Sequence, residues 1–151
     1  MLADSSHQDD RWRLFFAWRP SAEIRQDILD WIALAGQPEW VRWVKPENLH
    51  VTVYFVGNTI PDEVEILKKH ASKTLAEYSE FTLRSNRLEF RGKPGRASMI
   101  WLSFFNEMAF TNLHNALRAA VSDIVTHQSD FRDPIPHIKI ARMGRRFRNG
   151  S

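Results

Sequence analysis

The chain has 151 residues, enough for one domain that buries about 70% of its unfolded surface. It is 43% hydrophobic and 26% charged, as globular proteins usually are, and no apolar run approaches the roughly 20 residues of a membrane span. The absence of cysteine excludes disulfides, thiol catalysis and cysteine-bound zinc, and we expect a cytoplasmic protein.

The net charge is +3, and the basic residues are unevenly spread. One group lies between positions 84 and 96, and the other near the C-terminus comprises Lys139, Arg142, Arg145, Arg146 and Arg148. Any single member is most simply a solvated surface residue, but the groups together favour a polyanionic partner such as RNA.

The N-terminal half predicts two strands around one helix. Residues 1–11 are polar and acidic, and we expect a disordered lead-in there, followed by a single domain over 12–151. Arg13 to Trp18 has the composition of a strand. Ser21 suits a helix N-cap, and apolar spacing predicts a helix that ends at Gly36.

The remaining elements follow from the same signals. We predict a strand over 50–56, a helix over 61–78, strands over 81–90 and 98–104, a helix over 108–127 and a strand from 137. Glycine and proline turns between neighbouring strands favour antiparallel pairing, so the expected fold class is α+β. The similar surroundings of two histidines suggest a distant internal duplication.

Those two histidines begin the most informative segments, His50-Val-Thr52 and His137-Ile-Lys139. Each opens a stretch in which apolar residues alternate, so each histidine shares a strand face with the residue two positions later. One histidine can hold a proton while the other lacks it. Such a pair suits general acid–base chemistry on a phosphate, with the hydroxyl and the ammonium group binding phosphate oxygens.

A His-x-Thr tripeptide on a strand is frequent by chance, so the motif alone is weak evidence. The sequence has no glycine-rich phosphate loop, no Gly-x-Ser-x-Gly elbow and no His-Glu-x-x-His. Trp43 and Tyr54 lie beside the first histidine in the sequence and are candidates for stacking on a base. Packing in the core is the simpler role for most aromatic residues.

Longer segments resemble the 2H phosphoesterases, and within them the RNA 2',3'-cyclic phosphodiesterases, also called 2'-5' RNA ligases. The resemblance covers residues 12 to 142. It is carried by Lys45-Pro-Glu-Asn-Leu-His-Val-Thr-Val-Tyr-Phe-Val-Gly57 and by Pro136-His-Ile-Lys-Ile-Ala-Arg142. It implies a bilobal molecule with two antiparallel sheets, helices on the outer faces and a central groove.

The resemblance also implies roles for individual residues. His137 would be the base and His50 the acid, while Thr52, Lys139 and Arg142 would bind phosphate. Strict alternation from His137 puts Arg142 on the opposite strand face, so a bulge or the end of the strand would have to re-aim it.

Two features depart from the family pattern. Lys139 stands where relatives have threonine or serine, and the chain ends soon after the second motif, so we expect a second lobe completed differently or left open. The implied activity is opening of a cyclic phosphate at an RNA end to a 2'-phosphate, or 2'-5' ligation, by a monomer without metal, cofactor or membrane. The alternatives are a non-catalytic module that binds a nucleotide or RNA end, and a phosphodiesterase for another small cyclic phosphate.

Overall fold

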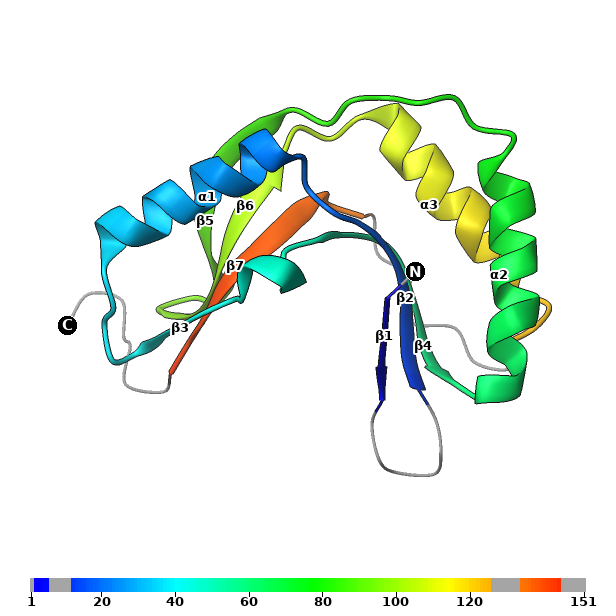
Figure 1. Ribbon diagram of the computed structural model, residues 1–151, viewed down its shortest axis with the longest axis horizontal. Coiled ribbons are helices and arrows are strands. Elements are labelled where there is room, and N and C mark those ends of the chain that lie inside the picture. The colour runs from blue at the N-terminus through cyan, green and yellow to red at the C-terminus, as the bar shows by residue number, and fades with distance from the viewer. Residues whose placement is uncertain (1, 6–11, 126–133, 145–151) are drawn as a thin grey trace. The chain divides into compact units, whose positions relative to one another are not determined.

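The computed structural model describes residues 2–5, 12–125 and 134–144, and every structural statement below refers to these residues (Figure 1). Their elements, in chain order, are β1 (Leu2–Ser5), β2 (Trp12–Trp18), α1 (Ala22–Ala35), β3 (Val41–Trp43), the 3₁₀ turn η1 (Pro46–Asn48), β4 (Val51–Thr59), α2 (Pro61–Leu75), β5 (Ser85–Lys93), β6 (Arg96–Phe104), α3 (Met108–Val121) and β7 (His137–Met143).

Every predicted helix and strand is present, although several ends differ. The strand expected from position 81 begins at Ser85, and the last two helices end earlier than predicted, at Leu75 and Val121. The short strands β1 and β3 and the turn η1 were not predicted. Residues 2–5 form β1, paired with β2, within the expected disordered lead-in, whereas residues 1 and 6–11 lie outside the described residues.

The residues at its two ends explain where helix α1 begins and ends. The Ser21 side chain accepts a hydrogen bond from the Ile24 amide at 3.3 Å, which satisfies one amide that the first turn leaves unpaired. At the other end, Gly36 has a φ of 81°, a conformation that costs glycine little, and its amide bonds to the Ile32 carbonyl.

The α+β class with antiparallel pairing is confirmed, but the expectation of two separate sheets is wrong. The strands form one hydrogen-bonded order, β1-β2-β4-β7-β6-β5, and β3 also pairs with β7. The join is the antiparallel pairing of β4 with β7, at Val51 and Ile138. Both side chains are apolar and buried, so this join also buries apolar surface.

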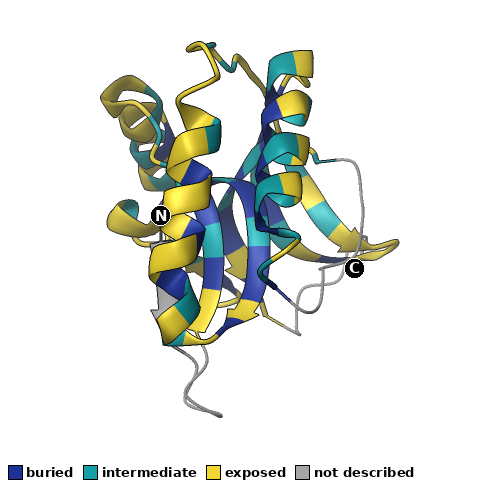
Figure 2. Ribbon diagram, turned by 90° about the vertical axis from the view of Figure 1, so that its right-hand side faces the viewer, coloured by how far each residue is buried: buried dark blue, intermediate teal, exposed yellow. Residues whose placement is uncertain are grey.

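The chain divides into two compact units. Unit 1 contains the described parts of Met1–Trp18, Thr52–Leu83 and Asn106–Pro136, and unit 2 those of Arg19–Val51, Arg84–Phe105 and His137–Ser151. In unit 1, α2 and α3 pack side by side, with Leu67 and Phe110 fully buried and the outer helix faces exposed (Figure 2). The single domain expected over 12–151 stays a prediction. None of the described helices is long and apolar enough to cross a membrane.

Unit 2 has a helix on one face of its strands. Helix α1 lies along the strands β5, β6 and β7 (Figure 1). Ile28 and Trp31 of α1 line a small pocket together with Leu88 of β5, Leu102 of β6 and Ile140 of β7. Because side chains alternate along a strand, the neighbours of these three strand residues point to the opposite face. That opposite face carries the candidate site.

Candidate active site

The pairing of β4 with β7 brings the two histidine motifs together. Val51 and Ile138, the middle residues of the two tripeptides, are direct partners, and they are 4% and 0% exposed. Their neighbours therefore point to the other face, where His50 lies opposite Lys139 and diagonal to His137. Diagonal neighbours of this kind are roughly 7–8 Å apart, so both imidazoles can approach one small anion.

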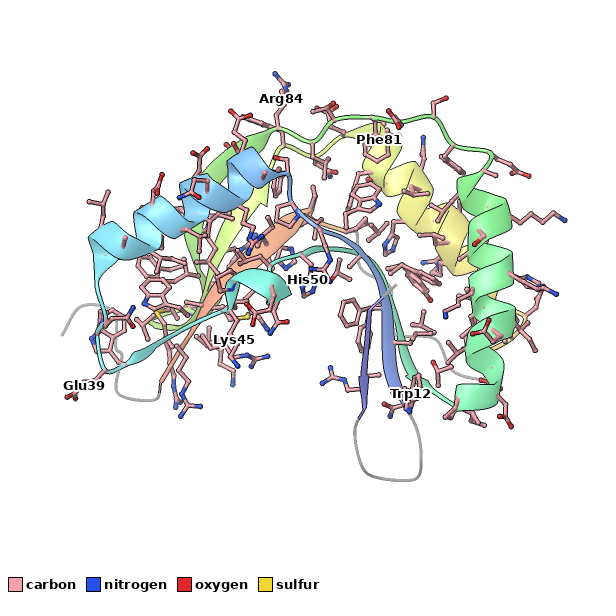
Figure 3. All side chains as sticks on the ribbon, viewed as in Figure 1. Trp12, Glu39, Lys45, His50, Phe81 and Arg84 are labelled. Carbon is pink, nitrogen blue, oxygen red and sulfur yellow. The ribbon has the colours of Figure 1, made fainter. Side chains whose placement is uncertain are left out.

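His50 is oriented by the backbone that precedes it. Figure 3 labels His50 near η1. Its Nδ1 lies 2.7 Å from the carbonyl oxygen of Asn48, the last residue of η1. A carbonyl oxygen only accepts hydrogen bonds, so Nδ1 must carry the proton and donate it. The second nitrogen, Nε2, is then the one that can exchange a proton with a substrate.

His137 is held in a different way, by stacking. Its ring lies on the ring of Trp101, with centroids 3.5 Å apart and planes inclined by 10°. Trp101 is the β6 partner of Lys139, and the Arg91 guanidinium carbon lies 4.5 Å from the Trp101 ring centroid. The indole plane therefore fixes the plane of the imidazole.

A polar network ties this aromatic stack to β5. Ser103, the β6 partner of His137, donates a hydrogen bond to Glu89 at 2.7 Å. Arg87 and Arg91 donate to the same carboxylate at 2.7 and 3.2 Å. The Ser103 hydrogen bond, followed by that from Arg87, lowers the pKa of Glu89 against the opposing effect of burial. Glu89 is thus held as an anion that anchors Arg91 beside Trp101.

A bulge in β7 re-aims Arg142. Lys139 pairs with Trp101, yet Ala141 pairs with the next β6 residue, Ile100, so Ile140 is an extra residue on β7. Ile140 and Ala141 are consecutively buried, and Arg142 is exposed. Arg142 therefore returns to the face of Lys139 through a bulge, one of the two possibilities that the sequence left open.

Strand β4 repeats the same sequence of burial, and this corrects one prediction. In both strands a half-buried residue alternates with a buried one until two consecutive residues are buried, Val53 and Tyr54 in β4 and Ile140 and Ala141 in β7. The next residue is half-buried in β4 and is the exposed Arg142 in β7. Thr52 is half-buried on the face of His50, whereas Tyr54 is 2% exposed with its ring edge-to-face against His114 of α3. The base-stacking role predicted for Tyr54 is wrong, because its ring is buried in the core of unit 1.

Trp43 is also not placed to stack on a base. It pairs with Ala141 on the face that α1 covers, and its ring meets Trp31 edge-to-face at 5.6 Å. Its Nε1 donates to the Gly36 carbonyl at the end of α1, at 3.0 Å. This residue fastens the helix end to β3, so the base-stacking prediction for Trp43 is wrong as well.

Sequence reasoning missed Trp101, Ser103 and Glu89. Alternation in the segments 85–93 and 96–104 separates these residues from the apolar Leu88 and Leu102, and that pattern was a usable signal. The pattern does not show which strand pairs with the segment 96–104. The pairing of that segment with β7 is what places these residues beside His137. Of the C-terminal basic group, Arg145, Arg146 and Arg148 lie outside the described residues.

Comparison with known proteins identifies a family. Residues 19–101 match the model of the LigT like Phosphoesterase family. The chain is 33% identical over 131 residues to the RNA 2',3'-cyclic phosphodiesterase of Escherichia coli, covering 86% of this chain and 71% of that protein. It is 24% identical over 140 residues to the protein of the same name from Archaeoglobus fulgidus, covering 89% and 74%.

Solved structures agree with these matches. Escherichia coli LigT complexed with 3'-AMP superposes with a TM-score of 0.72 at 26% identity, covering 91% of this chain and 76% of that one. The Thermus thermophilus protein TT0787 has the same fold, with a TM-score of 0.76 at 23% identity and coverage of 87% and 74%. The chain therefore belongs to the LigT-like phosphoesterase family, in the 2H group, and is related to RNA 2',3'-cyclic phosphodiesterases.

Proposed function

We propose that the protein is a metal-independent phosphodiesterase that opens a 2',3'-cyclic phosphate at an RNA end and leaves a 2'-phosphate. The observation that carries this proposal is the pairing of Val51 with Ile138, which puts both motif histidines on one sheet face. Kinship with proteins named RNA 2',3'-cyclic phosphodiesterase supports the same reaction.

The reaction needs one proton acceptor and one proton donor. His137 takes a proton from a water molecule while the water oxygen attacks phosphorus. The bond between phosphorus and the 3' oxygen breaks, and His50 gives its Nε2 proton to that oxygen. The products are a 3'-hydroxyl and a 2'-phosphate. Each positioned group typically contributes 10²- to 10⁴-fold to the rate.

The two imidazole rings have different surroundings, which supports different roles for His50 and His137. The carbonyl of Asn48 accepts from Nδ1 of His50, which leaves Nε2 as the nitrogen that can deliver a proton to the leaving oxygen. His137 instead lies on the ring of Trp101, which also contacts the Arg91 guanidinium, and it precedes Lys139 by two residues in the same strand.

Three further residues are proposed to bind phosphate. Thr52, on the strand face of His50, has a hydroxyl that can donate to a non-bridging oxygen. Lys139 lies opposite His50 and brings a full positive charge toward the oxygens that gain negative charge in the transition state. Arg142, returned to this face by the bulge, adds a second cation.

The proposed partner is an RNA end or a small nucleotide. A relative was solved with 3'-AMP, and a nucleotide of that size suits a face on which two imidazoles and an ammonium group meet. Joining of RNA ends through a 2'-5' linkage is part of the proposal, because a 5'-hydroxyl can attack the cyclic phosphate as water does and the same proton donor serves the leaving 3' oxygen.

The test is incubation of the purified protein with an oligonucleotide ending in cyclic phosphate, in the presence of a chelator, with the position of the product phosphate identified. His50→Ala and His137→Ala should each lower kcat by at least about 100-fold, because each removes one proton transfer. His70→Ala is the matched control, since His70 is exposed on α2. Full turnover by both motif variants would contradict the acid–base pair.

The same assay separates the alternatives. A module that binds without turnover would quench its tryptophan fluorescence with a nucleotide and release no product after long incubation. An enzyme for another small cyclic phosphate would turn over that compound and leave the oligonucleotide intact. A product with its phosphate on the 3' oxygen would contradict the proposed direction of ring opening.

A further inference from the structure

We propose that Arg91 of β5 is a positioning residue for the proposed base His137, and that it acts through the indole ring of Trp101. This inference rests on the proposed function and deepens it, because it adds to the acid–base pair a residue that touches neither the substrate nor the reacting atoms. Arg91 holds the indole in place, and the indole in turn holds the imidazole.

The three side chains form a stack across three neighbouring strands. In the order β7-β6-β5, His137 of β7 and Arg91 of β5 reach Trp101 of β6 from its two sides. The imidazole lies nearly parallel to the indole with ring centroids 3.5 Å apart, and the guanidinium carbon lies 4.5 Å from the indole centroid. A guanidinium over an aromatic ring is attracted by the negative charge of the ring face. The indole is therefore enclosed between the reacting imidazole and a cation.

Stacking is what keeps the indole in its orientation. The Nε1 atom of Trp101 is buried, and it has no hydrogen-bond partner among residues 2–5, 12–125 and 134–144. A buried donor without a partner costs free energy, and no directional bond from it fixes the rotation of the ring. The ring therefore depends on the groups packed against its two faces, and Arg91 supplies the contact on the side away from His137.

Glu89 holds Arg91 in the position that this stacking requires. Its Oε2 accepts a hydrogen bond from the Arg91 Nε at 3.2 Å and another from the Ser103 hydroxyl at 2.7 Å. Ser103 is 4% exposed and is the β6 partner of His137, so the carboxylate is anchored beside the reacting ring. Because the Arg91 Nε is bound to this carboxylate, the guanidinium plane cannot turn freely away from the indole.

Arg87 provides a matched control on the same carboxylate. It donates to the other oxygen, Oε1, at 2.7 Å, and its side chain is 71% exposed, against 37% for Arg91. Replacing either arginine removes one positive charge and one ion pair of Glu89. The loss of Arg91 also uncovers a face of the Trp101 ring, whereas the loss of Arg87 leaves both hydrogen bonds of Oε2 in place.

The kinetic test compares Arg91→Gln with Arg87→Gln on a mononucleotide 2',3'-cyclic phosphate at neutral pH. We expect Arg91→Gln to lower kcat by about tenfold with little change in KM, because a tilted imidazole slows proton transfer without weakening substrate binding. Arg87→Gln should keep the kcat of the unchanged protein. Equal kcat values for the two variants, or a loss in Arg91→Gln that lies in KM alone, overturn the positioning role.

Arg91→Lys is a second variant, and thermal unfolding of every variant shows whether it is folded. Lysine keeps the positive charge but lacks the planar group that lies flat on an indole. We expect the kcat of Arg91→Lys to fall in the same direction as that of Arg91→Gln. An Arg91→Lys variant with the kcat of the unchanged protein would show that charge suffices, and it would overturn the role of the stacked guanidinium.

A spectroscopic measurement separates this test from that of the proposed function. Protons of an imidazole stacked on an indole resonate upfield of those of an exposed imidazole, because of the indole ring current. In protein carrying isotope-labelled histidine, at about pH 8 where an ordinary imidazole is neutral, the His137 signal is the one missing from His137→Ala. Arg91→Gln should move this signal downfield, toward that of the exposed His70, and Arg87→Gln should leave it in place.

The two measurements fail in different ways. An unmoved His137 signal in Arg91→Gln overturns the inference even if the unchanged protein is an active phosphodiesterase. If the unchanged protein opens no cyclic phosphate, the proposed function fails. A His137 signal that moves in Arg91→Gln and stays in place in Arg87→Gln then still supports the positioning of His137 by Arg91.

Discussion

Individual side chains give the two motif histidines different surroundings. One ring donates from Nδ1 to the carbonyl of Asn48, and the other lies flat on Trp101. Equivalent positions in two similar strands are thus supported by unlike neighbours. A difference of this kind suits an acid and a base, because the two groups take opposite parts in the proposed reaction.

Trp101 is a positioning residue, and its replacement should affect rate more than binding. We expect Trp101→Leu to lower kcat by roughly 10- to 100-fold with a small change in KM, since a misplaced catalytic group costs rate in that range. Trp101→Phe keeps an aromatic plane and should recover most of the loss. The measurements are steady-state kinetics across pH and thermal unfolding of each variant. A loss of kcat that merely follows a loss of folded protein, or no recovery with Phe, would contradict positioning through the stack.

At the scale of elements, irregular strands set the site. The extra residue in β7 turns Arg142 outward, and the matching pair of buried residues in β4 turns Tyr54 inward. Period-two alternation would have put Tyr54 on the face of His50. The repeated burial order in the two strands agrees with the internal duplication suggested by the sequence.

The hairpin of β5 and β6 depends on Gly92. Its φ is 147°, and an added Cβ would lie 2.7 Å from both the Arg96 carbonyl oxygen and the Ser98 amide nitrogen. We expect Gly92→Ala to cost about 1–3 kcal/mol from backbone conformation, increased by this contact with rigid backbone. Gly36→Ala is the control, because its φ is 81° but no atom lies within 4 Å of the added carbon. Urea unfolding at neutral pH measures both, and an equal or smaller loss for Gly92→Ala would refute the steric argument.

At the scale of the whole molecule, the Glu89 network contributes to stability in a pH-dependent way. The folded protein holds the pKa of Glu89 below its ordinary 4.5, chiefly through Ser103 and then Arg87. A carboxyl with a lowered folded-state pKa stabilises the fold above its unfolded pKa. That stability is lost as the pH falls from about 4.5 through the folded value.

Glu89→Gln should therefore change how stability depends on pH. The difference in unfolding free energy between the unchanged protein and the variant should stay constant from about pH 7 to pH 5 and shrink below about pH 4.5. Urea unfolding at a series of pH values gives this difference, in which the contributions of other carboxylates cancel. A difference that stays the same at about pH 3.5 would show that the hydrogen bonds to Glu89 do not favour its charged form.

Much of this architecture could be predicted from local patterns. Ser21, Gly36 and the apolar spacing between them predicted α1, and the alternation after each histidine predicted β4 and β7. These signals act within one or two turns of helix or along one strand, so they are visible in the chain itself. The need for a bulge or a strand end before Arg142 was visible for the same reason.

The sequence by itself determined the helices, the main strands, the polar and apolar face of each strand, and both histidine motifs with the family they indicate. Only the tertiary structure decided that Val51 pairs with Ile138 in one continuous sheet and that the ring of Trp101 supports His137. It also decided that Trp43 and Tyr54 pack against other side chains, and that Arg42 faces Arg142. The physical reason is distance along the chain. Alternation and capping depend on near neighbours, whereas these contacts join residues that lie far apart in the sequence, up to 100 positions for Arg42 and Arg142, and their pairing is selected by burial of both faces together.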